Sequence, residues 1–323
     1  MPALSIKKSI FSLFGEVVTF IKKDFNWKAY LFTSVFIVLG LILNYHFHLY
    51  RDHIRNSYYT GSSLIVYPLF YIGIYFFVAI STLLLRKQYE VLKDYKFYLK
   101  GVFFVVLYGV GVGYFGYVKW SFASLLAEER TYILMLFSQF KCFLLFMPML
   151  FLMKFTVDQK IKGLYGLSKN TQHFDGYFAL FLFLIPFLIL ISFTPDFLEA
   201  YPQFKAWNYH GIFGMKTWMY TAVYETGYSL DFVMTELLFR GTLVIGMMLI
   251  MGRSAILPMV AFYVSIHYGK PMAEAISSIF GGYILGALAY QTRHIWGGVM
   301  VHISIALTME VMGLLQFYFF RNH

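Results

Sequence analysis

The sequence of 323 residues is poor in charge and in cysteine. Only 13% of its residues are Asp, Glu, Lys or Arg, whereas a soluble globular protein carries about a quarter. Cys142 is the only cysteine, which excludes an intramolecular disulfide and a thiolate metal cluster. We also expect no cleavable signal peptide in the first 27 residues, because Lys7 and Lys8 precede only a short, interrupted apolar stretch without a small-residue cleavage site.

Long apolar runs dominate the sequence. Hydrophobic residues make up 59% of the chain, and about 20 apolar residues are enough for a helix to cross a bilayer. The alternation expected of a membrane β-barrel is absent from these runs. The sequence therefore predicts an all-α protein, a polytopic transmembrane helical bundle of about eight spans. The candidate spans are 29–46, 63–85, 100–118, 131–153, 177–194, 230–251, 255–268, 272–290 and 295–320.

The net charge of +10 is distributed as membrane topology requires. Lysines and arginines gather in the N-terminal segment and in the connections after the second and fourth spans, and the intervening connections are poorer in them. This alternation follows the positive-inside rule and predicts a cytoplasmic N-terminus. We therefore expect these basic residues to interact with the lipid bilayer and not with a nucleic acid. The basic residues are Lys7, Lys8, Lys22, Lys23, Arg86, Lys87, Lys93, Lys96, Lys100, Lys154, Lys160, Lys162 and Lys169.

Two parts can be distinguished along the chain. Residues 1–175 are predicted to hold an N-terminal amphipathic segment and four transmembrane helices. Residues 176–323 hold most of the polar groups that lie inside apolar runs. Within the second part, between the fifth and sixth spans, the aromatic-rich stretch 195–228 suits an interfacial or re-entrant segment. In the span 272–290, Ser278, Gly282 and Gly286 recur every four residues, a pattern that allows close helix packing in membranes.

Four ionisable residues inside apolar runs form the candidate site. Glu236 and Arg240 are four residues apart, which puts them on one helix face where they can pair. His267 and His302 lie in the following runs. At 1.5 Å per residue, with Arg253 and Arg293 as membrane edges, the depths are about 14 Å for His302, about 21 Å for His267 and about 25 Å for Glu236. The three side chains could therefore line one cavity, and intramembrane ionisable residues are by default functional candidates.

Less specific interpretations of these residues stay open. Glu236 and Arg240 could simply pin two helices together, or couple protons in a transporter. A carboxylate and two histidines could also hold a divalent metal ion, although we favour a site without a cofactor. The other histidines lie at span edges, in connections or at the terminus and are predicted to be solvated or interfacial. They are His46, His48, His53, His173, His210, His294 and His323.

The stretch 231–310 resembles the CAAX protease and bacteriocin-processing (CPBP, Abi) family of intramembrane proteases. Three short motifs carry the resemblance. The Glu-Glu-x-x-x-Arg helix is matched by Thr235-Glu236-Leu-Leu-Phe-Arg240, the aromatic-x-x-x-His helix by Tyr263-Val-Ser-Ile-His267, and the His-x-x-x-Asn helix by His302-Ile-Ser-Ile-Ala306. Thr235 stands in place of the first glutamate, and Ala306 in place of the asparagine.

The resemblance implies a membrane-embedded peptidase that hydrolyses peptide bonds of a membrane-associated peptide or protein. In it, a glutamate activates water and histidines stabilise the oxyanion. Glu236, Arg240, His267 and His302 are the catalytic candidates, and Tyr263 is a candidate for substrate binding. Because Thr235 cannot act as a carboxylate base, Glu236 is the first substitute and Asp231 the second.

The alternative is a catalytically inactive relative that binds peptides as an immunity or scaffold protein. For either function, the expected location is the bacterial cytoplasmic membrane, with residues 176–323 as the protease-like core.

Overall fold

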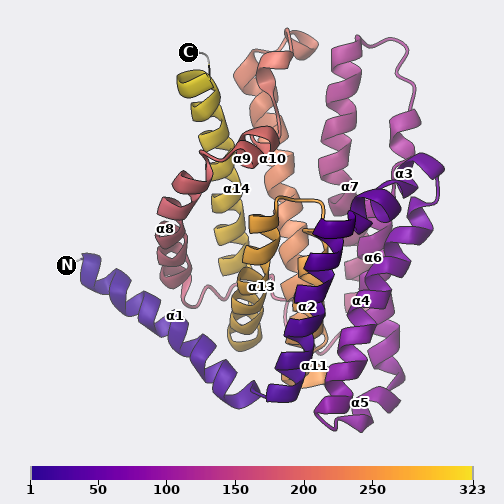
Figure 1. Cartoon of the computed structure of the whole chain (residues 1–323), viewed down its shortest axis with the longest axis vertical. Helices are drawn as coiled ribbons and strands as arrows, with labels where there is room; N and C mark the ends of the chain where they lie inside the picture. The colour runs from indigo at the N-terminus through magenta and orange to yellow at the C-terminus, as the bar shows by residue number, and fades with distance from the viewer. Residues whose placement is uncertain (1, 322–323) are drawn as a thin grey trace.

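The computed structural model describes the backbone of residues 2–321 and the side chains of residues 9–195 and 197–319. These residues form a bundle of roughly parallel helices that the surface helix α1 crosses at one end (Figure 1). The elements are α1 (Pro2–Asp24), α2 (Trp27–Phe47), η1 (Tyr50–Arg55), α3 (Ser57–Thr60), α4 (Ser63–Leu85), α5 (Tyr89–Lys93), α6 (Tyr95–Gly113), η2 (Gly116–Lys119), α7 (Ala127–Thr156), α8 (Phe174–Ile191), α9 (Pro195–Ala200), η3 (Ala206–Asn208), η4 (Ile212–Gly214), α10 (Thr217–Glu236), η5 (Leu237–Gly246), α11 (Met248–Met251), η6 (Gly252–Ala255), α12 (Ile256–Ser265), α13 (Met272–Thr292), α14 (Trp296–Gln316) and η7 (Phe317–Arg321).

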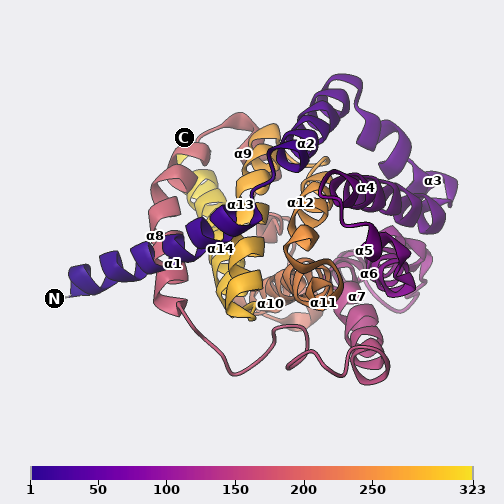
Figure 2. The same ribbon diagram turned by 90° about the horizontal axis from the view of Figure 1, so that it is seen from below.

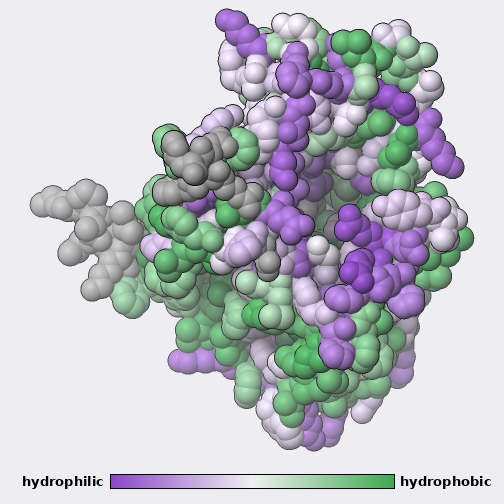
Figure 3. All heavy atoms as spheres, turned by 45° about the horizontal axis from the view of Figure 1, so that its top comes forward, coloured by the Kyte–Doolittle hydropathy of each residue, from purple (hydrophilic) through white to green (hydrophobic). Residues whose placement is uncertain are grey.

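The predicted all-α membrane bundle is confirmed. Among the described residues, eight helical segments are long and apolar enough to cross a membrane. One of them, Thr217–Ser265, joins α10, η5, α11, η6 and α12. Hydrophobic side chains cover much of the lower part of the face in Figure 3, and hydrophilic ones gather toward its upper part around a hollow. The chain is therefore an integral membrane protein.

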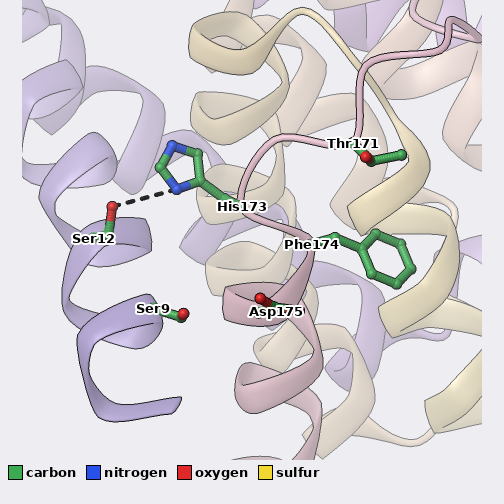
Figure 4. A pocket seen from close by; sticks show the side chains of 6 residues that line it. All are labelled: Ser9, Ser12, Thr171, His173, Phe174 and Asp175. Carbon is green, nitrogen blue, oxygen red and sulfur yellow. Dashed lines mark hydrogen bonds between the residues drawn. The ribbon is translucent and has the colours of Figure 1, made fainter. Parts of the chain in front are cut away.

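The N-terminal helix α1 is amphipathic and lies across the ends of other helices, as Figure 2 shows. Leu13, Val17 and Phe20 are buried against the bundle, whereas Phe11 and Phe14 are exposed. Such a helix suits the membrane surface, where it can bury apolar side chains on the bundle and in lipid. Its contact with the start of α8 is partly polar: Ser12 Oγ lies 3.3 Å from His173 Nδ1, beside an open pocket (Figure 4), while Leu13 and Val17 pack with Tyr177.

The short helix α12 determines how the site is built. Its ten residues rise about 15 Å, about half of the hydrocarbon thickness, so the predicted span 255–268 does not cross the membrane by itself. After α12 the chain turns through residues 266–271 and returns as α13. The small residues predicted to allow close packing serve this contact, because Gly282 lies against the Tyr263 ring and Gly286 against Met259.

The turn 266–271 is held by α2, which comes from the N-terminal half of the chain. Asn44 Nδ2 donates to the carbonyl of Tyr268 at 2.9 Å, and Tyr45 Oη donates to the carbonyl of Lys270 at 2.6 Å. Asn44 is buried and its Oδ1 also accepts from Tyr50 N at 3.0 Å. These side chains satisfy backbone groups that lie outside helices, as burial in a membrane protein requires.

The opposite end of the site helix rests on a buried ion pair. Lys100 Nζ lies 2.7 Å from Asp158 Oδ1 and also donates to the carbonyl of Gly246, the last residue of η5. Tyr165 donates its hydroxyl to Asp158 Oδ2 at 2.8 Å and packs on Gly246. The connection between α7 and α8 therefore closes over the end of η5.

Candidate active site

Glu236 is the centre of the candidate site. It is the last residue of α10, its side chain is fully buried, and its Oε1 contacts two cationic or polar groups. Arg240 Nη1 lies 2.9 Å away and His302 Nδ1 lies 2.6 Å away. The pairing predicted from the four-residue spacing of Glu236 and Arg240 is present, and α14 contributes a third group to it.

Close packing fixes the position of the Glu236 carboxylate. Gly298, one turn before His302 on α14, lies directly against it, because a Cβ on Gly298 would come within 2.9 Å of Glu236 Cδ. Immediately after Glu236 the helix widens into the π-helical segment η5, a geometry that is common at functional sites. The carboxylate is therefore enclosed by α14 on one side and by its own helix on the other.

Arg240 links the carboxylate to α12 and α13. Its guanidinium carbon lies 4.1 Å from the centroid of the Tyr263 ring, and its Nη2 lies 3.4 Å from the carbonyl of Gly281. The side chain is fully buried, with a relative exposure of 1%. Burying a guanidinium in this way requires a counter-charge, which Glu236 supplies.

Tyr263 contacts both histidines. Its hydroxyl lies 2.9 Å from His302 Nε2, and its ring centroid lies 4.8 Å from that of His267. Since Nδ1 of His302 faces a carboxylate, it carries the proton, and neutral Nε2 then accepts the Tyr263 hydroxyl hydrogen. Glu236, His302 and Tyr263 thus form a continuous polar chain across three helices.

His267, in the turn after α12, is oriented by the backbone of that helix. Its Nδ1 lies 2.9 Å from the carbonyl of Tyr263, which can only accept. The proton of the neutral ring is therefore on Nδ1, and Nε2 carries a lone pair. In this state Nδ1 of His267 donates a hydrogen bond to that carbonyl, and Nε2 can accept one.

Asp231 lies away from this cluster. Five residues along a helix correspond to a rotation of about 140°, so Asp231 and Glu236 face different sides of α10. Asp231 lies beside the Cys142 thiol of α7, with Lys141 nearby. These contacts connect it to the N-terminal half of the bundle.

Sequence reasoning missed two features of the site. One is Gly298, whose packing against Glu236 could not be recognised without the fold. His294 was predicted to be solvated or interfacial, which is wrong: it is 1% exposed, and its Nε2 donates to the carbonyl of Gln172 at 2.8 Å. His294 lies in the tight turn between α13 and α14, which the connection from α7 covers. His323 lies outside the described residues.

Within residues whose side chains are described, we find no group of three or more His, Cys, Asp or Glu side chains arranged to hold a metal ion. The two histidines of the site are instead engaged by a carboxylate, a hydroxyl and a carbonyl.

The fold and the site together define a polytopic helical membrane protein with a buried carboxylate–arginine–histidine cluster. Comparison with protein families gives a more specific assignment for the part of the chain that carries this cluster. Residues 209–308 match the model of the Rce1-like family, described as type II CAAX prenyl endopeptidase Rce1-like. The segment is therefore an Rce1-like domain of the CPBP type, as the motifs predicted, and it supports a function of the membrane endopeptidase type. No curated protein and no solved structure matches the chain.

Proposed function

We propose that this protein is an intramembrane endopeptidase that hydrolyses a peptide bond of a membrane-associated peptide or protein. The observation that carries the proposal is the contact of 2.6 Å between the buried Glu236 carboxylate and His302 Nδ1, at a ring that is itself 16% exposed. A carboxylate that holds one nitrogen of an imidazole makes the other nitrogen a better base. This is the arrangement that hydrolysis by activated water requires.

In the proposed mechanism, Glu236 activates water through His302. The carboxylate has no exposed surface, so water meets the imidazole first. His302 Nε2 takes a proton from water as the water oxygen bonds to the carbonyl carbon of the substrate. The imidazolium is stabilised by Glu236 and then returns the proton to the leaving amine nitrogen as the C–N bond breaks.

Tyr263 and His267 supply the remaining functions. The Tyr263 hydroxyl now donates to His302 Nε2; when water replaces it there, the hydroxyl can donate to the developing oxyanion. His267 has a lone pair on Nε2 and can accept the second hydrogen of the attacking water. We therefore assign stabilisation of the oxyanion to Tyr263 and positioning of the water to His267. Arg240 balances the charge of the Glu236 carboxylate.

The substitutions at Thr235 and Ala306 are compatible with this mechanism. The resemblance implies that the asparagine normally found at the position of Ala306 orients the last histidine. Here Nδ1 of His302 lies 2.6 Å from Glu236 Oε1 and Nε2 accepts from the Tyr263 hydroxyl, so these two contacts position the ring without that asparagine. The proton acceptor expected at Thr235 is replaced by the Glu236–His302 pair.

A binding-only function is the second candidate. It is favoured by one observation: the carboxylate that the mechanism uses is completely enclosed and paired with Arg240, as in a purely structural ion pair. In that case the cluster joins α10, α12 and α14, and the protein binds a membrane peptide without cutting it.

The two candidates differ in what His302→Gln should do. Gln can still bond to Glu236 and Tyr263 but is not a base. Under the peptidase proposal, His302→Gln should reduce the rate of cleavage by about 10²–10⁴-fold, the usual contribution of a general base, while the protein still accumulates in membranes. The matched control is Trp218→Phe, at a side chain of α10 that is 67% exposed. This variant should leave the rate of cleavage unchanged. Equal cleavage by wild type and His302→Gln would exclude the mechanism.

The orientation in the membrane follows from charge. We propose that the N-terminus and the connection between α7 and α8 lie in the cytoplasm, because both are rich in lysine. We further propose the bacterial cytoplasmic membrane as the location. Cysteine accessibility at exposed positions on the two sides, for example Lys160 and Lys119, would test the orientation.

A further inference from the structure

A second cavity lies outside the candidate active site, between α2, η1 and α4. Its volume is about 290 Å³, and its walls are almost entirely apolar. The hydroxyphenyl group of Tyr268 forms its inner end, against the backbone of Gly40. The wall residues used below are Phe36, Leu43, Phe70 and Ile74, with His53 at the η1 end. Except for Tyr268, these residues precede the Rce1-like segment.

The cavity is at the depth of the lipid acyl chains. Helix α2 has 21 residues and rises about 31 Å, which equals the hydrocarbon thickness of a bilayer, about 30 Å. The outer face of α2 is exposed and apolar, with Leu39 at 52% and Ile42 at 57% relative exposure. The cavity is therefore next to lipid along its length.

The end of the cavity near η1 carries imidazole and guanidinium groups. Exposed His46, His48, Arg51, His53 and Arg55 lie within ten residues of one another, and the single acidic residue among them, Asp52, pairs with Arg51 at 2.8 Å. Since η1 follows α2 directly, the guanidinium groups of Arg51 and Arg55 lie at the membrane–water interface. Basic side chains there attract anionic lipid headgroups.

We propose that this cavity is a binding site for an anionic phospholipid, with one acyl chain between α2 and α4 and the phosphate beside His53 and Arg55. An apolar cavity of this kind stays dry, and the surrounding bilayer provides the chain that fills it. Its volume is at the lower end of ligand pockets, which are about 300–1,000 Å³, and suits a single chain. Arg55 supplies the positive charge that attracts the anionic headgroup, and the His53 imidazole supplies a hydrogen-bond donor.

The experiment uses the purified full-length protein and two photoactivatable lipids. One is phosphatidylglycerol with a diazirine in an acyl chain, and the other is the phosphatidylcholine of the same chains. Labelled peptides are mapped by mass spectrometry. Leu43→Trp fills the cavity from a position that is 43% exposed, and Leu39→Trp is its control on the outer face of the same helix.

With wild type, phosphatidylglycerol should label the peptides of α2 and α4 that line the cavity. Leu43→Trp should abolish this labelling, and Leu39→Trp should retain it. His53→Ala combined with Arg55→Ala should lower labelling by phosphatidylglycerol by about fivefold or more, the effect of roughly 1 kcal/mol for the Arg55 charge. Arg130→Ala, an exposed arginine at the start of α7, should not lower it.

Equal labelling of Leu43→Trp and Leu39→Trp would refute the cavity as the site. Equal labelling by the two lipids in wild type would refute selection of an anionic headgroup. If Leu43→Trp fails to fold, the exposed pair His53→Ala and Arg55→Ala decides, because neither side chain supports the core. None of these results depends on whether the protein cleaves peptides.

Discussion

Neutralising one member of the buried Glu236–Arg240 pair should destabilise the protein far more than neutralising both. Glu236→Gln leaves the Arg240 guanidinium buried at 1% exposure without its counter-charge. Removing one partner of a buried pair costs about 3–5 kcal/mol. The Tyr263 ring, 4.1 Å from the guanidinium carbon, retains a cation–π contact of about 2 kcal/mol, so we expect a loss of about 3 kcal/mol.

The double variant Glu236→Gln with Arg240→Met removes both charges and keeps similar side-chain volumes. Replacing a buried pair by uncharged groups is often close to neutral, so its unfolding free energy should be within about 1.5 kcal/mol of wild type. The coupling energy between the two positions should then be about 2 kcal/mol or more.

The assay is reversible unfolding of the purified protein in mixed detergent micelles, measured for wild type, both single variants and the double variant. The control cycle uses Glu90 and Lys93, a pair on α5 that is 2.9 Å apart but 87% and 72% exposed. Exposed pairs of this kind couple by less than about 1 kcal/mol. If the buried cycle couples no more strongly than the surface cycle, the pair is not the electrostatic centre described above.

Three further predictions test the packing around the site. Gly298→Ala should displace the Glu236 carboxylate and reduce cleavage, whereas Gly73→Ala, where a Cβ meets nothing within 4 Å, should not; peptide cleavage by matched amounts of protein measures this. Asn44→Ala should lower the unfolding free energy by about 1–3 kcal/mol, because it leaves the Tyr268 carbonyl and another backbone group unpaired. Lys100→Met should cost about 3–5 kcal/mol, and adding Asp158→Asn should recover most of that loss.

Each of these has a result that would count against the structure. Gly298→Ala with undiminished cleavage would mean that the carboxylate need not be held there. A neutral Asn44→Ala would mean that α2 does not hold the turn 266–271. A double variant at Lys100 and Asp158 as unstable as Lys100→Met alone would show that the two charges are not coupled.

Much of the fold follows from composition, because hydrocarbon allows so few backbone arrangements. Apolar runs gave nine candidate spans for about eight expected, and two of them, 230–251 and 255–268, belong to one of the eight helical segments of the described residues. The four-residue spacing of Glu236 and Arg240 indicated the contact between these two side chains. The pattern of Ser278, Gly282 and Gly286 identified the face on which α13 packs. In each case the signal is local, lying within one helix.

The arrangement of the site could not be obtained in the same way. Straight-helix estimates put Glu236 and His302 about 11 Å apart in depth, yet their side chains are in contact at 2.6 Å. The π-helical segment η5 and the turn at Gly252, with φ of 58°, change the path of the chain between Glu236 and Arg253. The partner of His302 therefore depends on helix irregularities and on packing between distant helices, which periodicity does not encode.

The most direct test of the central proposal compares protein termini in membranes from cells that carry wild type, His302→Gln, Glu236→Gln or no protein. Abundance of the variants is matched, so that loss of stability is separated from loss of chemistry. We predict a set of new termini with wild type that is absent from the other three samples. Identical termini with wild type and His302→Gln would contradict catalysis by the Glu236–His302 pair.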